Sequence, residues 1–405
     1  MSRIRIKKFG PIKDGYIDND RWIDISKVTV FIGNQGSGKS TVAKLISTFM
    51  WLEKALIRGD VKLPISYQNF TEHMEFHRIE NYLQPNTEIE YEGAIYHLVL
   101  NKRSIKVNEK KSSSSIKQPK IMYVPAERNF LSSITNINKV SDLIMGSLKI
   151  YSIEFRNAQL AHKVKPIELP INNTKIVYDP NDDENYLMFE DKRLKLSEAS
   201  SGFHSIAPLH WVTKYLIEFI KQGEKKLLKL LSTDQTIRRD NELKELNKKE
   251  FSKTTIRTKE KRINEKYVCK YFVNIVEEPE QNLFPSSQRL LLNDLLAYNN
   301  EDNMLIMTTH SPYLINYLTL AVEAGRLKAK VKSKELEERL NKIVPLNSTL
   351  EENDLVIYQL DEKNGTITKL KTYRGLPSDE NYLNDGLAES NELFSNLLDI
   401  EDLCR

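Results

Sequence analysis

The feature that most constrains this chain is the octapeptide Gly33-Asn-Gln-Gly-Ser-Gly-Lys-Ser40, which fits the pattern GxxxxGK[ST] in full. A short β-branched run, Val28–Ile32, precedes it, as expected of a strand buried on both faces. Apolar residues at helical spacing follow it, between Val42 and Phe49. Glycines in such a turn let the backbone wrap closely and aim N–H groups at a phosphate, at the positive end of the helix dipole. The sequence therefore predicts a phosphate-binding loop between a buried strand and a helix.

The loop assigns roles to particular side chains. Lys39 would reach the β- and γ-phosphates of a nucleotide, and Ser40 would ligate Mg²⁺. The competing interpretation is a chance glycine-rich turn, which the strand before the motif and the helix after it disfavour. The residues predicted to bind nucleotide are Gly33, Asn34, Gly36, Ser37, Gly38, Lys39, Ser40 and Thr41.

Two further apolar strands end in polar residues. Val273–Val276 leads to Glu277 and Glu278, and residues 304–307 lead to His310. Ligands of open α/β sheets bind beyond the carboxyl ends of the strands. We expect Glu277 to hold the Mg²⁺ shell, Glu278 to orient the attacking water, and His310 to contact a γ-phosphate as a second catalytic residue. The alternatives are a solvated acidic turn and a structural histidine.

A fourth motif is Leu196–Gly202, at the start of a helix that stays apolar to about residue 220. Ser200, Ser201 and Gly202 offer hydroxyls, backbone N–H groups and the helix dipole. These groups suit a phosphate that is already held elsewhere. An ordinary serine N-cap is the alternative interpretation.

The rest of the chain divides by its patterns. Residues 87–107 predict a β-hairpin, and residues 131–165 predict helix. Residues 221–266 carry 15 basic and 8 acidic residues, a local excess of +7, with few apolar anchors; we expect a charged helical arm. A strand pair around Asn364-Gly365 and a helical tail end the chain.

Composition excludes several classes. The 405 residues carry a net charge of only +4, so any nucleic-acid surface must be local. Cys269 and Cys404 lack CxxC partners, which disfavours a disulfide framework and a zinc site. Apolar runs fall far short of the roughly 20 residues of a membrane span, and the first residues lack an apolar signal core. We therefore expect a soluble cytoplasmic protein that does not bind membranes.

With these motifs in order, the chain resembles the ABC-type ATPases of the SMC, Rad50, RecF and OLD group. The resemblance covers residues 1–320, with 87–107 and 221–266 as insertions, and leaves 321–405 as a C-terminal α/β extension. It implies an α/β P-loop NTPase fold with an antiparallel β subdomain and a helical insertion. It also implies hydrolysis of ATP with Mg²⁺, and a homo-oligomer, at least an ATP-dependent head-to-head dimer, in which the signature of one protomer meets the ATP of another.

Two positions depart from the usual family pattern. Phe203 stands where Gln or Glu is usual, and Glu277 replaces the Walker B aspartate. Both departures are similar to those of the small OLD-like ATPases of prokaryotic antiviral systems. The stretches Glu277–Glu280 ("EEPE"), Thr309–Pro312 ("THSP") and Pro125–Arg128 ("PAER") also resemble that subfamily.

The subfamily implies a sensor that holds a toxic effector and releases it when a viral trigger protein arrives. About 90 residues follow His310 and contain no DxD, so we expect no nuclease activity of its own and a Toprim-type effector nuclease supplied in trans. The basic arm, 221–266, would suit an acidic, DNA-mimicking trigger or, secondarily, DNA; a solvated helical face is the plainer interpretation. The alternative function is a DNA-clamping repair ATPase like RecF or Rad50, although the arm is short for a coiled coil. Rings larger than a dimer would need a second interface.

Overall fold

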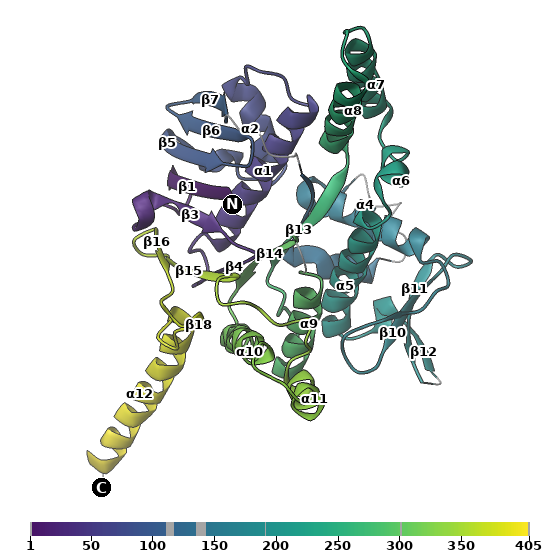
Figure 1. The fold of residues 1–405 in the computed structure, drawn as a ribbon. Helices are drawn as coiled ribbons and strands as arrows, with labels where there is room; N and C mark the ends of the chain where they lie inside the picture. The colour runs from purple at the N-terminus through teal and green to yellow at the C-terminus, as the bar shows by residue number, and fades with distance from the viewer. Residues whose placement is uncertain (1, 111–116, 135–142, 191, 300–301, 404–405) are drawn as a thin grey trace.

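The computed structural model describes residues 2–110, 117–134, 143–190, 192–299 and 302–403 (Figure 1). Its central sheet has seven strands in the order β2-β16-β15-β4-β14-β13-β8. Their bounds are Gly15–Tyr16 (β2), Thr366–Lys369 (β16), Leu355–Asp361 (β15), Val28–Gly33 (β4), Met304–Thr309 (β14), Cys269–Glu277 (β13) and Gln118–Val124 (β8). The strands β15, β4, β14, β13 and β8 are parallel to one another. The strand before the phosphate loop thus lies in the middle of a parallel sheet.

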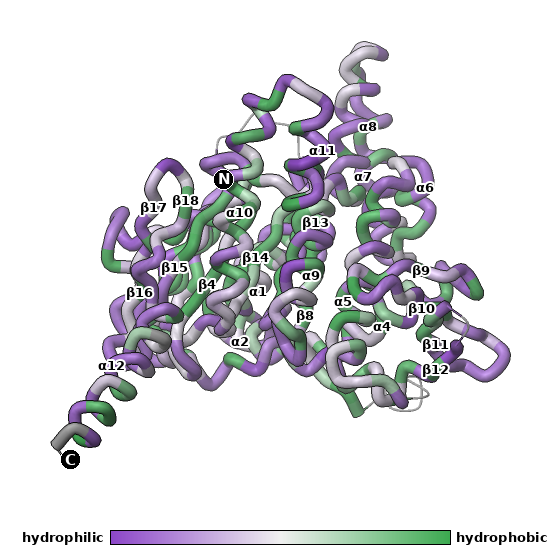
Figure 2. Tube along the Cα trace, turned by 90° about the horizontal axis from the view of Figure 1, so that it is seen from below, coloured by the Kyte–Doolittle hydropathy of each residue, from purple (hydrophilic) through white to green (hydrophobic). Residues whose placement is uncertain are grey.

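Both faces of this sheet are covered, which explains the unbroken apolar run of β4. Val28, Val30 and Ile32 pack into one core with a group of four helices, here called the helical side. Phe31 packs into the core on the opposite face, with α1. The first group of helices is α4 (Gly146–Ala161), α5 (Ser201–Ile220), α9 (Pro285–Ala297) and α10 (Pro312–Lys328). The opposite face holds α1 (Lys39–Arg58) and α2 (Tyr67–Glu75). Figure 2 shows β4 and β15 as hydrophobic segments inside the molecule.

A five-stranded antiparallel sheet lies beside α1, in the order β3-β1-β5-β6-β7. Its bounds are Ile23–Ile25 (β3), Ser2–Phe9 (β1), Leu83–Glu92 (β5), Tyr96–Asn101 (β6) and Ser104–Glu109 (β7). The hairpin predicted at residues 87–107 is part of these last three strands. Short 3₁₀ helices flank the sheet at Asn19–Arg21 (η1) and Glu80–Tyr82 (η2).

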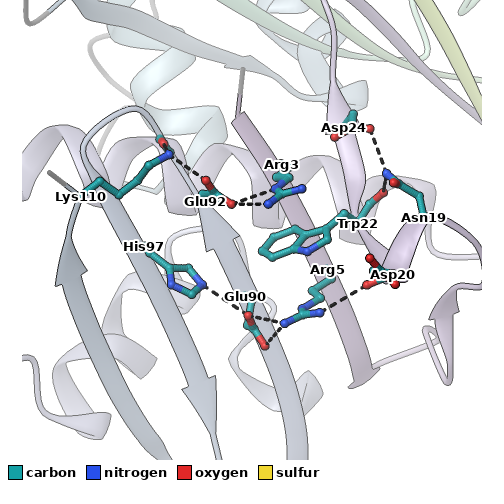
Figure 3. Close-up of polar contacts among 11 residues, drawn as sticks. Arg3, Arg5, Asn19, Asp20, Trp22, Asp24, Glu90, Glu92, His97 and Lys110 are labelled. Carbon is teal, nitrogen blue, oxygen red and sulfur yellow. Dashed lines mark hydrogen bonds and ion pairs between the residues drawn. The ribbon is translucent and has the colours of Figure 1, made fainter. Parts of the chain in front are cut away.

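Cross-strand charge pairs stabilise this sheet on its outer face (Figure 3). Arg3 and Arg5 lie opposite Glu92 and Glu90 in the strand register, and each forms an ion pair of 2.7 Å with its partner. Both guanidinium groups also lie about 4.5 Å from the Trp22 ring centroid, a cation–π arrangement. Hydrogen bonds from Lys110 and Arg3 lower the pKa of Glu92 to about 2. The Arg3–Glu92 pair therefore stays ionised through the physiological pH range.

The helical side carries a four-stranded antiparallel sheet, β12-β11-β10-β9. Its bounds are Lys192–Lys195 (β12), Glu184–Phe189 (β11), Lys175–Asp179 (β10) and Ile167–Glu168 (β9). Within the helix predicted over 131–165, Gly146–Ala161 forms α4, and the first residues belong to a 3₁₀ helix, Ala126–Ser133 (η3). The turn that begins at Pro125 is held tightly by a buried arginine described below. Residues 135–142 lie outside the described residues.

The charged segment after α5 is helical and projects from the body (Figure 1). It contains α6 (Glu224–Leu228), α7 (Thr233–Asn247) and α8 (Lys253–Tyr267). Lys266 and Tyr267 of α8 both bond the carboxylate of Glu242 on α7, at 2.5 and 2.8 Å. Arg238 reaches Asp60, just after α1, at 2.5 Å. Polar contacts thus take the place of an apolar core in this arm, as its composition indicates.

Beyond α10 lie α11 (Lys334–Ile343), a small β17–β18 pair (Thr372–Tyr373 and Leu376–Pro377) and α12 (Tyr382–Leu403). Figure 1 shows α12 projecting from the body, and Leu393, Phe394 and Leu397 on it are exposed. The domain boundary at residue 320 stays a prediction, but two strands beyond it, β15 and β16, belong to the sheet that carries the phosphate loop. Among the described helices, none combines the length and the apolarity needed to cross a bilayer.

Candidate functional site

Three neighbouring parallel strands deliver the predicted motifs to one edge of the sheet. In the register, Glu277 lies beside Thr308, and Thr308 lies beside Phe31. The carboxyl ends of β13, β14 and β4 therefore meet side by side. Sequence reasoning expected ligands at this edge, and the phosphate loop, Glu278 and His310 do come together there.

The phosphate loop has a backbone that demands glycine. Gly33 and Gly38 have φ of 146° and 100°. A Cβ at Gly33 would lie 2.4 Å from the Leu360 carbonyl oxygen, and one at Gly38 would lie 2.6 Å from Ile12. Gly36, at φ 78°, faces open space on its outer side. The loop is thus packed against protein on one side and accessible on the other, as a cradle for an outside ligand requires.

Lys39 opens α1 and bends back over the loop. Its Nζ donates hydrogen bonds of 2.8 Å to the carbonyl oxygens of Gly33 and of Asn34. Burial lowers the pKa of Lys39 to about 8, although the carboxylates of Glu278 and Glu280 act against the shift. A phosphate bound at this position would give the buried ammonium a fully charged partner and would favour its protonated form.

The remaining loop residues have distinct environments. The Ser37 hydroxyl is buried and has no hydrogen-bond partner among the described residues. Ser40 is half-buried and Thr41 is buried. The Asn34 amide donates to Glu362 Oε1 at 2.8 Å, at the end of β15. The unpartnered Ser37 hydroxyl and the open side of Gly36 fit an oxyanion ligand.

Glu277 and Glu278 point in different directions. Glu277 is buried, and its carboxylate accepts hydrogen bonds from the Tyr123 hydroxyl at 2.5 Å and the Ala126 N–H at 3.2 Å. Glu278 has a left-handed backbone, φ 43°, and lies with its Oε1 3.5 Å from His310 Nε2. His310, followed by Lys39, lowers the pKa of Glu278. Glu278 is thus an ionised, accessible carboxylate, as a water-orienting role needs, whereas Glu277 is turned toward β8.

Sequence reasoning assigned no role of this kind to Glu280. Its Oε1 accepts hydrogen bonds from the Thr309 hydroxyl at 2.8 Å and the His310 N–H at 2.7 Å. Burial raises the pKa of Glu280. Glu280 therefore fixes the backbone from which the His310 side chain projects.

The role of Arg128 was not predicted from the sequence, where this residue was noted only as part of the "PAER" stretch. The side chain is completely buried, and all five of its N–H groups donate hydrogen bonds. Nη1 and Nη2 donate to the carbonyl oxygens of Glu277 and Glu278, each at 2.7 Å. Nε and Nη2 also donate to the carbonyl and hydroxyl of Ser205 on α5, and Nη1 donates to Pro125. The guanidinium thus joins the end of β13 to the helix of the fourth motif.

That fourth motif opens α5. Ser200 is its N-cap and makes no side-chain capping bond, so the first N–H groups of the helix lack that partner. Ser200 and Ser201 are exposed, and a Cβ at Gly202 would lie 3.1 Å from the Asn282 carbonyl oxygen. Within the described part of the chain, no hydrogen bond connects Ser200, Ser201 or Gly202 to the phosphate loop. The motif is therefore exposed at the surface.

The packing of Phe203 explains why an aromatic residue stands directly after the fourth motif. It is buried and packs edge-on against Phe189 of β11, with ring centroids 5.6 Å apart. A polar residue here would lose this contact with the small sheet.

The predicted ligands of Mg²⁺ are Ser40 and Glu277. Among the described residues, no group of three or more His, Cys, Asp or Glu side chains could hold a metal ion. Mg²⁺ in phosphate sites takes few protein ligands and keeps waters and substrate oxygens. Ser40 and Glu277 stay the predicted contributors.

Fold and loop together define a P-loop NTPase fold of the α/β class. No family model matches the chain, and no curated protein is similar to it. Among solved structures, an SMC head domain from Thermotoga maritima is 12% identical, with a TM-score of 0.37 over 92% of this chain and 98% of that one. An Smc head domain from Pyrococcus furiosus, bound to the C-terminal domain of ScpA, is 10% identical with a TM-score of 0.39 over 98% and 100%. A dimeric ATP-binding cassette bound to ADP and Pi is 11% identical with a TM-score of 0.30 over 92% and 100%. At these scores, the functional argument rests on the chain's own geometry.

The five hydrogen bonds of Arg128 predict a large penalty for a conservative substitution. Lysine offers three donors instead of five, so Arg128→Lys leaves buried carbonyl oxygens unsatisfied. We expect a loss of about 2–5 kcal/mol in the free energy of unfolding, measured by urea denaturation. Arg156→Lys is the matched control, since Arg156 bonds side chains at a partly exposed site. A loss no greater than that of the control would contradict the assigned role.

Proposed function

We propose that this chain is an ATP-binding, ATP-hydrolysing ABC-type ATPase that assembles as a homo-oligomer around the nucleotide. One observation carries the proposal: Lys39 is held over the phosphate loop at the sheet edge where Glu278 faces His310. Phosphoryl transfer requires a positioned cation, a water-orienting group and metal support, and little else from the protein.

The proposed roles follow from the contacts. Lys39 would exchange its two carbonyl partners for the β- and γ-phosphate oxygens. Glu278 would accept a hydrogen bond from the attacking water, and His310 would contact the γ-phosphate. Ser40 would hold Mg²⁺, which neutralises charge that develops on the phosphates. Glu277 would join it by giving up a hydrogen bond to Tyr123 or Ala126.

The oligomer is proposed because the outward-facing motif needs a partner. Ser200, Ser201 and Gly202 present hydroxyls and free helix N–H groups to solvent, and an anion is their natural ligand. In a head-to-head dimer, the ATP bound by one protomer would supply that anion to the other. Arg128 would then connect this motif, through Ser205 on the same helix, to the Glu277–Glu278 backbone of the same chain.

The biological role is proposed from the resemblance of the motifs. We propose a sensor and scaffold of an antiviral defence system, most similar to AriA, the ATPase subunit of the PARIS system. It would hold a Toprim-type effector nuclease, encoded separately, and release it on meeting a viral trigger protein. The basic arm of α6, α7 and α8 is the proposed contact for an acidic, DNA-mimicking trigger, because complementary charge favours such an encounter.

The first prediction concerns nucleotide binding. Lys39→Ala removes the only side-chain cation of the loop, and we expect ATP affinity to fall by about 100-fold. Isothermal titration calorimetry with MgATP measures it, with Lys44→Ala on the same helix as the control. Retention of wild-type affinity by Lys39→Ala would refute the phosphate-loop assignment.

The second prediction concerns turnover. Glu278→Gln keeps the shape of the side chain but weakens its ability to polarise water, so we expect hydrolysis to fall by about 100-fold or more. ATP-bound oligomers should then accumulate, as measured by sedimentation in MgATP. Glu323→Gln, on the surface of α10, is the control. Wild-type turnover in Glu278→Gln would remove Glu278 from the water-orienting role.

The third prediction concerns the partner. Affinity co-purification from the native locus, followed by mass spectrometry, should recover a Toprim-type nuclease with the wild-type protein. The recovery should be lost or altered with Lys39→Ala, because assembly depends on ATP. Recovery of DNA without a protein partner would instead favour a DNA-clamping ATPase.

A further inference from the structure

A cavity of about 490 Å³ lies at the edge of the central sheet, away from the phosphate loop. Its walls come from α1, α2, the edge strand β8 and the start of α4. The cavity therefore lies between the side that carries the phosphate-loop helix and the helical side. Its volume falls within the range typical of small-molecule sites.

Aromatic rings line much of this cavity. Trp51 and His73 form one pair, with ring centroids 4.9 Å apart. Phe76, His77 and Tyr123 form a row, with successive centroids 4.7 and 4.6 Å apart. Trp51 and Phe76 remain 39% and 38% exposed, so the rings reach the mouth of the cavity. Such walls favour a flat, unsaturated ligand that can stack.

Positive charge exceeds negative charge along the lining. Lys54, Arg58 and Lys120 line the cavity, and Glu72 is the one acidic side chain among the described lining residues. Each cation has a contact of its own: Lys54 with the Pro119 carbonyl and Cys269, Arg58 with Asp60, and Lys120 with Glu154. These anchors hold the cations in place. Basic side chains thus outnumber acidic ones by three to one in the lining, although burial lowers the pKa of Lys54, and Asp60 and Glu154 pair with the other two cations.

The helix α4 adds a further attraction for an anion. Its N-cap, Met145, provides no side-chain hydrogen bond, and Ser147 of its first turn lines the cavity. Gly146 fits closely there, since a Cβ would lie 2.5 Å from the Phe76 carbonyl oxygen. The start of α4 is thus packed directly against the aromatic wall.

Two buried polar atoms of the lining residues have no hydrogen-bond partner within the described parts of the chain. They are His77 Nδ1 and Arg58 Nε. His77 is 97% buried, and burial lowers its pKa to about 3, so its ring is neutral at physiological pH. Buried polar groups normally find partners, because an unsatisfied one costs about 1–3 kcal/mol.

We propose that this cavity binds a small planar aromatic anion. The ring system stacks between the aromatic walls, and the anionic group lies toward Arg58, Lys120 and the start of α4. The ligand also contacts Tyr123, whose hydroxyl holds the Glu277 carboxylate. A bound ligand therefore contacts the residue that holds Glu277 and can influence ATP hydrolysis. That influence rests on the proposed ATPase function, whereas ligand binding itself does not.

Three matched probes test the ligand class on the full-length protein. Naphthalene-2-sulfonate is planar and anionic, 2-naphthalenemethanol is planar and neutral, and cyclohexanesulfonate is anionic without an aromatic ring. Calorimetry should show one-to-one binding of naphthalene-2-sulfonate, with the other two probes about tenfold weaker or worse. Saturating MgATP should leave this binding intact, because the cavity and the phosphate loop share no residue.

Variants locate the binding. Lys120→Gln should weaken naphthalene-2-sulfonate about five- to tenfold, and Lys117→Gln, an ion-paired lysine outside the cavity, should not. Ile150→Trp fills the rim and should abolish binding, with an unchanged far-UV circular dichroism spectrum confirming the fold. Equal affinities for the charged and neutral naphthalenes, displacement by MgATP, or wild-type binding in Ile150→Trp would each overturn the proposal. If the wild-type protein binds naphthalene-2-sulfonate but does not hydrolyse ATP, only the proposed function is refuted.

Discussion

A single buried guanidinium organises the sheet edge on which everything else depends. Arg128 carries its charge into a completely buried position, and the five hydrogen bonds it donates compensate for that burial. Four of the five involve either the backbone after β13 or Ser205 of α5. Without it, the carbonyl groups of Glu277 and Glu278 would lie unsatisfied beside an apolar core. The 3₁₀ turn of η3 and the left-handed backbone of Glu278 are both positioned around this group.

Arg128 thus connects the two parts of the candidate site, the start of α5 and the end of β13, by direct hydrogen bonds. The outward-facing start of α5 and the accessible carboxylate of Glu278 are separated along the chain by more than 70 residues, yet Arg128 contacts both segments. On the other side, Glu280 fixes His310 through its backbone N–H. A displacement of the start of α5 would thus reach Glu278 and His310 through short polar contacts, without a rearrangement of the sheet.

Sequence patterns were sufficient where the signal is local. The phosphate loop and the apolar strands β4, β13 and β14 follow from short windows, because a strand buried on both faces is a run of consecutive apolar residues. Convergence of Glu278 and His310 followed from a general rule on parallel sheets. The structural roles of Arg128 and Glu280 could not be predicted, because their partners come from distant segments. An arginine next to a proline turn looks like a surface residue until its environment is known. The cavity beside β8 was equally hidden, since four separate elements form it.

The position of β4 has a consequence for biosynthesis. Its two neighbours, β14 and β15, lie roughly 275 and 325 residues further along the chain. During translation, both edges of this apolar strand stay unpaired until those distant segments have left the ribosome. Long-range parallel pairing is slow, and unpaired apolar edges promote aggregation. The nascent chain is therefore expected to need protection from aggregation until β14 and β15 have been made, and the phosphate loop cannot reach its final conformation before then.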